Sequence, residues 1–574
     1  MLWRLLRPYL RPRAGAIVVV VLMLVGQSLG NLYLPNLNAD LINRGVVEGN
    51  LGYIWATGAG MLVVTLAISA VAIVGVYWAS RVSMAVGADL RRDVFGSVQA
   101  FSLRDMGDFG TPSLITRNTN DVQQIQMVLQ VSLTMMVIAP IMMIGGMVFA
   151  IREGARLLPV LAVAVPLMVV FLALMMSRVV PRFRVMQVKI DRITQVLREQ
   201  ITGVRVIRAF VRGGDELRRF DDANGDLTAT TLSVNRLFAL MMPTMMAILN
   251  LTTVAVMWFG GRLTAEGAVS IGNLTAVLSY ILQILIAVMM ATMLAIMVPR
   301  AMASAERIGQ VLAAVPSITD PSTARRPGRV DGRVELADVR FSYPGSERAI
   351  LEGLTFGVEP GQMSAVIGGT GSGKSTLLNL IVRFLDVSAG SMRVNGLDVR
   401  EQAREALWSS IGLVPQAAYL FRGTVASNLR VGDERASDDD LWRALTVAQA
   451  QDFVAEMGGL EAPIDQGGTN VSGGQRQRLA IARALVKRPA LYLFDDCFSA
   501  LDAETDARLR AALPGYTGTA SVVVVSQRVS TIMGADQIIV LDEGRIAGAG
   551  SHGDLMASCE PYRAIALSQL GPSA

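Results

Sequence analysis

The sequence reads Gly368-Gly369-Thr370-Gly371-Ser372-Gly373-Lys374-Ser375 in its C-terminal half, and this stretch decides the fold of that half. Glycines let a loop wrap around phosphate oxygens with its N–H groups turned inward, and a following helix adds its positive end. The apolar run Met363–Ile367 precedes the loop as a strand, and a helical run follows from Ser375, which is the context that such a loop requires. We therefore predict an α/β nucleotide-binding domain in which Lys374 reaches the β- and γ-phosphates and the Ser375 hydroxyl binds Mg²⁺.

A second apolar strand supports the same chemistry. The run Leu491-Tyr492-Leu493-Phe494-Asp495 reads as a buried strand that ends in a carboxylate. A carboxylate at that position can hold the Mg²⁺ of a bound nucleotide. Other short β-rich runs occur at Arg333–Phe341 and Ser521–Val525, with helical stretches between them. This alternation predicts one α/β domain over residues 331–574.

A third motif indicates the family. Val471-Ser472-Gly473-Gly474-Gln475 opens a helical run and resembles the signature of ATP-binding cassette (ABC) proteins, which is specific to that family. In ABC proteins two nucleotide domains dimerise head to tail, so that the signature of each chain covers the γ-phosphate bound by the other. The remaining family motifs follow in order. Tyr343 would stack on adenine, Gln416 lies in the Q-loop, and Ser499-Ala500-Leu501-Asp502 is the D-loop.

The resemblance implies a set of residues for ATP, a set for its metal and a set for catalysis. The ATP-binding residues would be Tyr343, Gly368, Gly369, Thr370, Gly371, Ser372, Gly373, Lys374, Ser375, Thr376, Ser472, Gly473, Gly474 and Gln475. Mg²⁺ would be held by Ser375, Gln416 and Asp495. The catalytic positions would be Gln416, Asp496, Asp502 and Gln527.

Two of the catalytic positions depart from the family pattern. The family places a glutamate where this sequence has Asp496 and a histidine where it has Gln527, and the single histidine of the chain is His552. The shorter Asp496 side chain should leave its carboxylate roughly 1–1.5 Å short of the attacking water, and a misplacement on that scale can cost ~10²-fold in rate. Glutamine lacks the shape and proton chemistry of imidazole. Neutral sequence drift at two tolerant positions is the alternative explanation of these departures, but the sequence retains the other ATP-binding residues.

These departures predict one half of an asymmetric pump. The chain resembles the subunit of heterodimeric exporters that binds ATP at a degenerate, slowly hydrolysing site and lends its signature to the competent site of its partner. The partner would be a second half-exporter with an intact glutamate and histidine, and together they would form an ATP-hydrolysing translocase. Two alternatives stay open: a homodimeric exporter with slow turnover, and an ATP-gated regulatory or channel-like subunit.

The composition indicates a membrane protein. Hydrophobic residues make up 52% of the 574 residues, charged residues only 17%, and the mean hydropathy is +0.45. The net charge is +5, but the arginines flank apolar segments and form no single patch, which disfavours nucleic acid as a partner. A soluble ABC protein that acts on ribosomes or DNA would lack such apolar segments. The two cysteines imply no disulfide framework.

Six apolar segments are each near the ~20 residues that cross a bilayer as a helix. They are Ala14–Leu34, Tyr53–Trp78, Leu133–Ala150, Leu157–Met176, Leu237–Phe259 and Leu274–Val298. Four arginines precede the first segment, and the long connections after the second and fourth segments are rich in arginine. By the positive-inside rule both termini, the long connections and the nucleotide-binding domain are cytoplasmic. We predict a multi-pass protein of the bacterial cytoplasmic (inner) membrane.

The predicted fold class is therefore an all-α membrane domain of six transmembrane helices with long cytoplasmic extensions, followed by the ABC-type P-loop α/β domain. The expected limits are 1–312 for the membrane domain and 313–330 for a linker rich in proline and serine. Apolar residues at helical spacing in Val185–Arg212 predict that a helix continues beyond the bilayer. By analogy with ABC exporters, short crosspieces are expected near Met106–Pro112 and Val211–Phe220.

The residues of the membrane spans are compatible with several substrate classes. Methionines are frequent in them and suit either an adaptable apolar cavity or ordinary helix packing. Asn36, Asn250, Tyr280 and Gln283 are polar residues at or near membrane depth, for which hydrogen bonds between helices are favoured over cavity lining. The central parts of the spans lack charged residues, which disfavours an ion pathway. Hydrophobic drugs, lipids or lipidated compounds remain as substrate classes.

Overall fold

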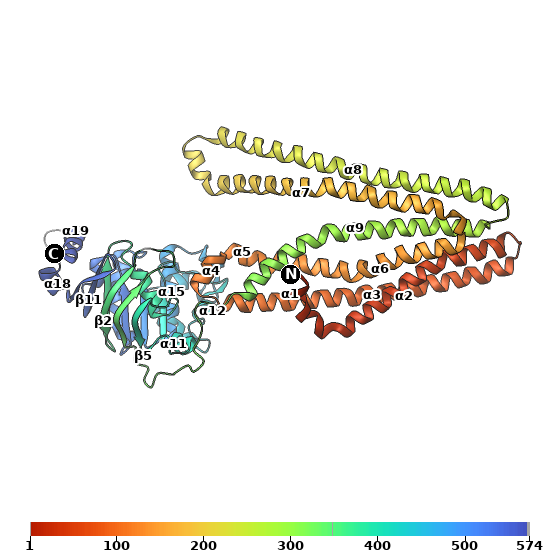
Figure 1. Ribbon diagram of the computed structural model, residues 1–574. Helices are drawn as coiled ribbons and strands as arrows, with labels where there is room; N and C mark the ends of the chain where they lie inside the picture. The colour runs from red at the N-terminus through yellow and green to blue at the C-terminus, as the bar shows by residue number, and fades with distance from the viewer. Residues whose placement is uncertain (1, 347, 571–574) are drawn as a thin grey trace. The chain divides into compact units, whose positions relative to one another are not determined.

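The computed structural model describes residues 2–346 and 348–570. Its contacts divide the chain into two compact units. The first unit comprises Met1–Gln99 and Thr111–Ala314, and the second comprises Ala100–Gly110 and Val315–Ala574. The first is built of helices, and the second combines helices with strands, as the fold-class prediction requires (Figure 1).

The first unit consists of long helices that contain all six predicted spans. The helices are α1 (Leu2–Leu10), α2 (Ala14–Asp40), α3 (Leu51–Ala100), α5 (Thr111–Thr116), α6 (Val122–Gly154), α7 (Leu158–Ala209), α8 (Gly213–Ala265) and α9 (Ile271–Ala313). Five continuous helical runs are long and apolar enough to cross a membrane. The run Thr111–Ala209 has 99 residues and carries two of the predicted spans, on either side of a 3₁₀ turn at Ala155–Leu157.

Polar side chains within the spans form hydrogen bonds between helices. The Tyr280 hydroxyl on α9 donates to the Leu32 carbonyl oxygen at 3.0 Å, and the Gln283 amide donates to the Asn31 carbonyl oxygen at 3.0 Å. The Asn36 amide donates to Glu153 at 2.7 Å. For three of the four predicted residues the interhelical role is therefore observed, which suits groups that hydrocarbon cannot hydrate.

Helices α7 and α8 form an antiparallel hairpin, which Figure 1 shows as two ribbons side by side. Lys189 lies 3.8 Å from Asp226, and Arg219 lies 2.6 Å from Glu199, so ion pairs link the two helices. The continuation of α7 to Ala209 agrees with the predicted helical extension. The segment Val211–Phe220, where a crosspiece is expected, comprises the turn after α7 and the first residues of α8, which begins at Gly213.

A buried carboxylate links the start of α6 to α9. Asp121 ends a π-helical turn, Arg117–Asp121, and is 2% exposed. It accepts hydrogen bonds from the Ser304 hydroxyl at 2.9 Å and from Arg307 Nε at 2.7 Å. A buried carboxylate with a charged and a neutral donor is satisfied, so this cluster fixes two helices against each other.

The second unit contains two main sheets and a two-stranded sheet. Its strands are β1 (Val334–Phe341), β2 (Leu351–Val358), β3 (Met363–Gly368), β4 (Ala389–Val394), β5 (Leu397–Asp398), β6 (Ile411–Val414), β7 (Gly423–Thr424), β8 (Pro463–Ile464), β9 (Leu491–Asp495), β10 (Ser521–Val525), β11 (Gln537–Asp542) and β12 (Arg545–Gly550). The six-stranded sheet has the order β12-β11-β3-β10-β9-β6, and the four-stranded sheet has the order β2-β1-β4-β5. β3, β6, β9, β10 and β11 run parallel, and only β12 is antiparallel to its neighbour among the described strands of the larger sheet.

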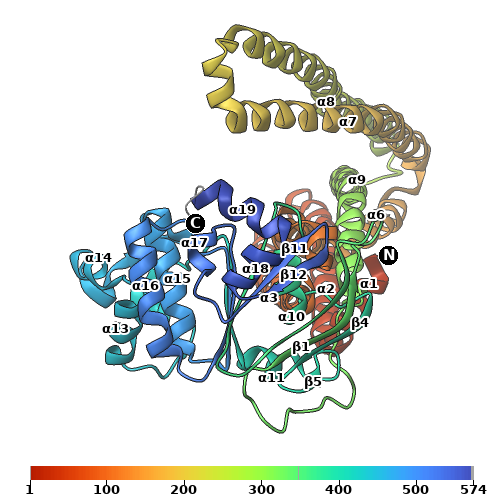
Figure 2. The ribbon, with the colours of Figure 1, turned by 90° about the vertical axis from the view of Figure 1, so that its left-hand side faces the viewer.

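The second unit also contains helices. They are α4 (Leu103–Phe109), α10 (Lys374–Ile381), α11 (Arg404–Ser409), α12 (Val425–Leu429), α13 (Asp438–Val447), α14 (Gln451–Glu456), α15 (Gly473–Lys487), α16 (Ala503–Thr517), α17 (Val529–Ile532), α18 (His552–Ser558) and α19 (Glu560–Leu570). Figure 2 shows α13, α14, α15 and α16 gathered on one side of the larger sheet. β10 is buried along its whole length, as expected for a parallel strand that is covered on both faces.

Helix α4 packs with the second unit although it lies between α3 and α5 in the sequence. Ser102 caps its start, and the Ser102 hydroxyl lies 2.7 Å from the Ser317 hydroxyl. The Asp105 carboxylate accepts from the backbone N–H groups of both serines, at 2.9 and 3.0 Å. This helix overlaps the crosspiece predicted at Met106–Pro112, which starts and ends three residues later.

We expect Asp121→Ala to lower the midpoint of thermal unfolding of the first unit by several degrees. The change leaves Ser304 and Arg307 without their acceptor, and a buried polar group left unsatisfied costs ~1–3 kcal/mol. Asp222→Ala is the control, because Asp222 is an exposed acid on α8 for which the described residues provide no ion pair. Equal shifts for both variants, measured by the temperature dependence of aggregation in detergent, would contradict this role of Asp121.

Candidate functional site

A pocket of about 340 Å³ lies where β3, β9 and β10 end on the same edge of the larger sheet. All but two of its lining residues are among the predicted site residues. The predicted ones are Tyr343, Thr370, Gly371, Gly373, Lys374, Ser375, Thr376, Gln416, Asp495, Asp496 and Gln527. The other two, Ile350 and Val525, are apolar residues that no motif marks. Parallel strands bring these distant parts of the chain together because their carboxyl ends share one edge.

The phosphate-binding loop connects β3 to α10. Gly373 precedes α10 with φ at 95°, in the left-handed region that favours glycine. A Cβ at this position would come within 2.4 Å of the Leu351 side chain, so both conformation and space require glycine. The loop therefore delivers Lys374 and Ser375 on the first turn of α10, with the N–H groups of a helix start behind them.

Lys374 is folded into the loop that precedes it. Its ammonium donates to the carbonyl oxygens of Gly368 at 2.9 Å and Gly369 at 2.7 Å, and it lies 3.3 Å from the Ser372 hydroxyl. Burial lowers the pKa of Lys374, while Asp496 and Asp495 oppose this shift. The ammonium is hydrogen-bonded to neutral carbonyl oxygens, which the charged oxygens of an incoming phosphate can replace with stronger bonds.

The residues predicted to hold Mg²⁺ lie close together. The Ser375 hydroxyl donates to Asp495 Oδ1 at 3.1 Å, and Gln416 lines the same pocket. Burial raises the pKa of Asp495, and the hydrogen bond from Ser375 partly opposes this shift. A carboxylate, a hydroxyl and an amide oxygen are the oxygen donors that Mg²⁺ prefers, with phosphate oxygens and water to complete its shell. The donor set therefore fits Mg²⁺ bound together with a nucleotide.

Asp496 follows β9 in an unusual backbone conformation. Its φ is 45°, in the left-handed region that aspartate tolerates better than most residues, and its N–H donates to the Val525 carbonyl oxygen at 2.9 Å. The side chain is 7% exposed. Gln416 Nε2 lies 3.5 Å from its Oδ2, at the limit of a hydrogen bond, and Oδ1 has no partner among the described residues. The carboxylate is thus placed in the pocket without a firm hydrogen bond to orient it.

Gln527 is exposed and follows β10 on the other side of the pocket. Its carbonyl oxygen accepts from the Gln569 amide at 2.7 Å, and Gln569 Oε1 accepts from the Val529 N–H at 2.8 Å. Gln569 on α19 thereby holds the backbone of the segment that carries Gln527. Sequence analysis missed this residue, because a glutamine near the end of an amphipathic helix carries no motif.

The remaining predicted residues do not line the pocket. Ser472 caps α15 and accepts from the Gln475 N–H at 3.2 Å, while Gln475 Oε1 accepts from the Ser472 N–H at 2.9 Å. Asp502 caps α16 by accepting from the Thr505 N–H at 2.9 Å. Gly473 and Gly474 form the first turn of α15. Gly368, Gly369 and Ser372 belong to the phosphate-binding loop. The roles predicted for all of these residues stay predictions.

The raised pKa of Asp495 predicts how nucleotide binding depends on pH. Mg²⁺ needs the ionised carboxylate, so the Mg²⁺-dependent part of ATP binding should fall on acidification at a pH above the ~4 of an ordinary aspartate. Binding of a fluorescent ATP analogue, with and without Mg²⁺, measures this part. Asp495→Asn is the control and should remove it at every pH. Mg²⁺-dependent binding that persists unchanged down to pH ~4 would contradict the prediction.

Comparisons with known proteins agree with the two units. A family model described as ABC transporter transmembrane region matches residues 17–289, and one described as ABC transporter matches residues 351–499. A solved structure, a bacterial Atm1-family ABC exporter with ATP bound, has a TM-score of 0.80 over 98% of this chain and 99% of that one. Its sequence identity of 23% makes this a similarity of fold.

Curated relatives match most or all of the chain. An uncharacterized ABC transporter ATP-binding protein of Mycobacterium tuberculosis is 45% identical over 573 residues, which are 99% of this chain and 98% of that protein. Another of Bacillus subtilis is 33% identical over 98% of each chain. An ATP-dependent lipid A-core flippase of Aromatoleum aromaticum is 32% identical over 86% of this chain and 82% of the flippase. With the phosphate-binding loop, the strand-end carboxylate and the signature in place, this chain belongs to the ABC transporter family, as a half-transporter that joins a transmembrane region to an ATP-binding domain.

Proposed function

We propose that this chain is one half of a heterodimeric ABC exporter that moves hydrophobic or amphipathic compounds out of the cytoplasm. Its own pocket binds ATP and Mg²⁺ and hydrolyses ATP slowly. Its signature completes the competent site of a second half-exporter that has the glutamate and the histidine. The observation that carries the proposal is one pocket lined by Lys374, Ser375 and Asp495 together with Asp496 and Gln527, the two residues that the family resemblance aligns with the water-activating glutamate and histidine.

The geometry of Asp496 supports slow hydrolysis. Its carboxylate ends one methylene short of a glutamate, and its nearest donor is Gln416 Nε2 at 3.5 Å. A general base must lie within hydrogen-bond reach of the water that it polarises, and its rate advantage is lost when it is misplaced. Gln527 can donate a hydrogen bond but supplies no imidazole for the γ-phosphate. Binding is retained because neither residue belongs to the phosphate-binding loop.

The signature supports a role toward a partner. Ser472, at the start of α15, is exposed, and the capping bonds with Gln475 fix the geometry of this helix start. An exposed helix start with a serine hydroxyl and glycine N–H groups is suited to a γ-phosphate that another chain presents. Asp502 at the start of α16 would lie in the same interface by family analogy. A homodimer would contain two slow sites, so a partner with the glutamate and the histidine makes the faster pump.

A cavity in the first unit supports a hydrophobic substrate. It has a volume of about 440 Å³ and is lined by residues of α6, α7, α8 and α9. Six of its nine lining residues are methionines, namely Met135, Met241, Met245, Met289, Met290 and Met293. The other three are Leu172, Ile286 and Thr292, so no charged residue lines it. Flexible thioethers adapt to apolar molecules of different shape, which suits a lipid chain or a hydrophobic drug. Lipid A-core flippases among the relatives are compatible with this class.

The arginines support the proposed orientation and location. Arg4, Arg7, Arg11 and Arg13 precede or begin the first membrane-spanning helix, and clusters of this kind remain on the cytoplasmic side. Both termini and the ATP-binding domain would then be cytoplasmic. The cytoplasmic membrane of a bacterium is the compartment that we propose, and the bilayer is the medium from which an apolar substrate reaches the cavity.

The ATPase rate of the isolated chain tests the slow site. We expect the purified chain in lipid nanodiscs to bind ATP but to turn over slowly, and Asp496→Glu combined with Gln527→His to raise the rate by about tenfold to a hundredfold. Lys374→Ala controls for contaminating ATPases. Fast turnover by the unmodified chain alone, lost in Asp496→Asn, would overturn the proposal in favour of an active homodimer. Co-purification with a second half-exporter tests the heterodimer directly.

The methionine-lined cavity gives a separate test of the substrate class. Met245→Ala removes a buried thioether from the cavity wall and should weaken binding of an apolar fluorescent dye by about three- to tenfold. Met246→Ala is the matched control, because Met246 is the next residue on α8, is 48% exposed and does not line the cavity. Equal dye affinities for the two variants would place the apolar binding site elsewhere.

A further inference from the structure

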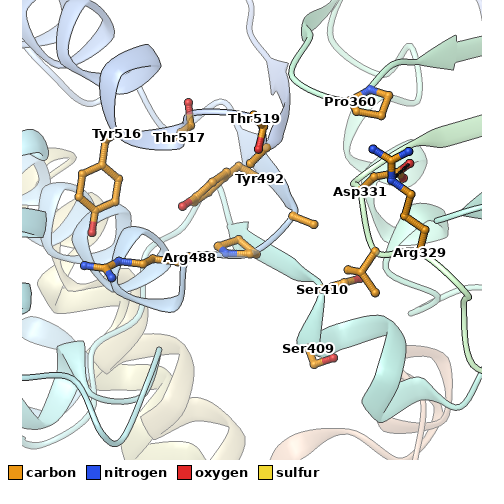
Figure 3. A pocket seen from close by; sticks show the side chains of 14 residues that line it. Arg329, Asp331, Pro360, Ser409, Ser410, Arg488, Tyr492, Tyr516, Thr517 and Thr519 are labelled. Atoms are coloured by element: carbon orange, nitrogen blue, oxygen red, sulfur yellow. Dashed lines mark ion pairs between the residues drawn. The ribbon is translucent and has the colours of Figure 1, made fainter.

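A second pocket of the ATP-binding unit lies at the sheet edge opposite to the ATP pocket. It has a volume of about 590 Å³ (Figure 3). It is lined where β9 and β10 begin, whereas the ATP pocket is lined where they end. Its lining residues come from the linker, from α11, from the end of α15 and from α16. The predicted ATP-site residues and the family motifs leave all of them without a role.

Tyr492 presents an unpartnered hydroxyl to this pocket. The side chain is only 2% exposed, and its ring stacks on Phe494 with 6.1 Å between the ring centres. The described residues give its hydroxyl no hydrogen bond, and burial raises the pKa of Tyr492, so the hydroxyl stays protonated and can donate. The hydroxyl is not among the fully buried polar atoms that lack a partner, so it keeps access to the pocket and can donate to water or to a bound acceptor there.

Arg488 forms one wall beside Tyr492. It ends α15 with φ at 48° and ψ at 53°, a left-handed conformation that is uncommon for arginine. Its guanidinium donates to Asp440 at 2.8 Å, and a hydrogen bond with Tyr516 raises the pKa of Arg488. The Tyr516 hydroxyl itself lies 3.4 Å from the Leu485 carbonyl oxygen. A guanidinium has five N–H groups, so Arg488 retains donors for a ligand.

Arg329 stands on the opposite wall. Its Nε lies 3.4 Å from Asp331, and its side chain is 84% exposed, so it is free to turn toward a ligand. Asp331 already accepts from the Arg333 N–H at 3.2 Å. Figure 3 shows Arg488 and the Tyr492 hydroxyl on one side of the pocket and Arg329 with Asp331 on the other, and Asp331 is the one carboxylate among the described lining residues. With two arginines against one carboxylate among the described lining residues, the pocket carries a net positive charge, which favours an anion over a cation.

We infer that this pocket is a second ligand site, which takes a small phosphate-bearing molecule between Arg488 and Arg329 with the Tyr492 hydroxyl at its base. Guanidinium groups match phosphate oxygens with paired N–H donors, and the ring faces of Tyr492 and Tyr516 offer apolar contact. The volume lies in the ~300–1,000 Å³ range of small-molecule sites. Inorganic phosphates and nucleotides share this chemistry.

Calorimetric titration of pyrophosphate into the full chain carrying Lys374→Ala tests the site, because that background disables the phosphate-binding loop. We expect Tyr492→Phe to weaken pyrophosphate binding by about three- to tenfold, as one lost hydrogen bond to an anion requires. Arg488→Gln should weaken it by tenfold or more. Tyr562→Phe is the matched control, since this second buried tyrosine bonds to His552 at 2.7 Å outside the pocket, and it should leave the affinity unchanged.

Hydrogen exchange measured with and without pyrophosphate locates the binding site in the chain. Pyrophosphate should slow exchange in residues 488–492 and 516–519, and Tyr492→Phe should reduce this protection. A parallel titration with AMP separates the sources, because tighter binding of AMP assigns a nucleotide and tighter binding of pyrophosphate assigns an inorganic phosphate. Absence of binding at millimolar pyrophosphate, or equal binding by the Tyr492→Phe, Arg488→Gln and Tyr562→Phe variants, would overturn the inference. None of these readouts depends on ATPase or transport activity.

Discussion

The hydrogen bond between Ser375 and Asp495, at 3.1 Å, is the contact on which the ATP pocket depends. It joins the first turn after β3 to the end of β9, two strands that are separated in the sheet only by β10. The parallel order places the phosphate-binding loop, the metal-binding carboxylate and the segment of Gln527 on one edge. Once these strand ends are in register, Asp496 and Gln527 line one pocket together with Lys374 and Ser375.

Much of this arrangement could be predicted from the sequence because the motifs coincide with strand ends. The starts of β1 and β9 lie within one residue of the predicted runs, and β10 matches its run, since these strands are apolar segments bounded by turns. The pocket gathers the predicted loop residues with Tyr343 and Gln416 for the same reason. Ile350 and Gln569 escaped prediction because their contribution arises from contacts between segments that are distant in sequence. The crosspiece near Val211–Phe220 stays a prediction, because its first residues lie in the turn after α7 and the others form the start of α8.

The helical unit shows a different balance between sequence and structure. Hydropathy predicted the central part of each span but underestimated the lengths of the helices, because their polar extensions carry no hydropathy signal. Helix α3 has 50 residues, a length of about 75 Å, which exceeds the ~30 Å of hydrocarbon more than twofold. The interhelical bonds of Tyr280 and Gln283 fix α9 against α2, and the Asp121–Arg307 pair fixes α9 against the π-helical turn that precedes α6. Apolar packing fills the space between these polar anchors.

The two hydrogen bonds of Gln569 connect α19 to the backbone of the ATP site. Gln569 holds the backbone on both sides of Arg528, directly after the position where the family has its histidine. The stability of α19 is therefore part of what positions Gln527. An affinity tag fused close behind this helix, or a truncation that removes it, would perturb nucleotide chemistry from a distance. For biochemical work on this protein, the choice of which terminus to tag becomes a choice about the integrity of its ATP pocket.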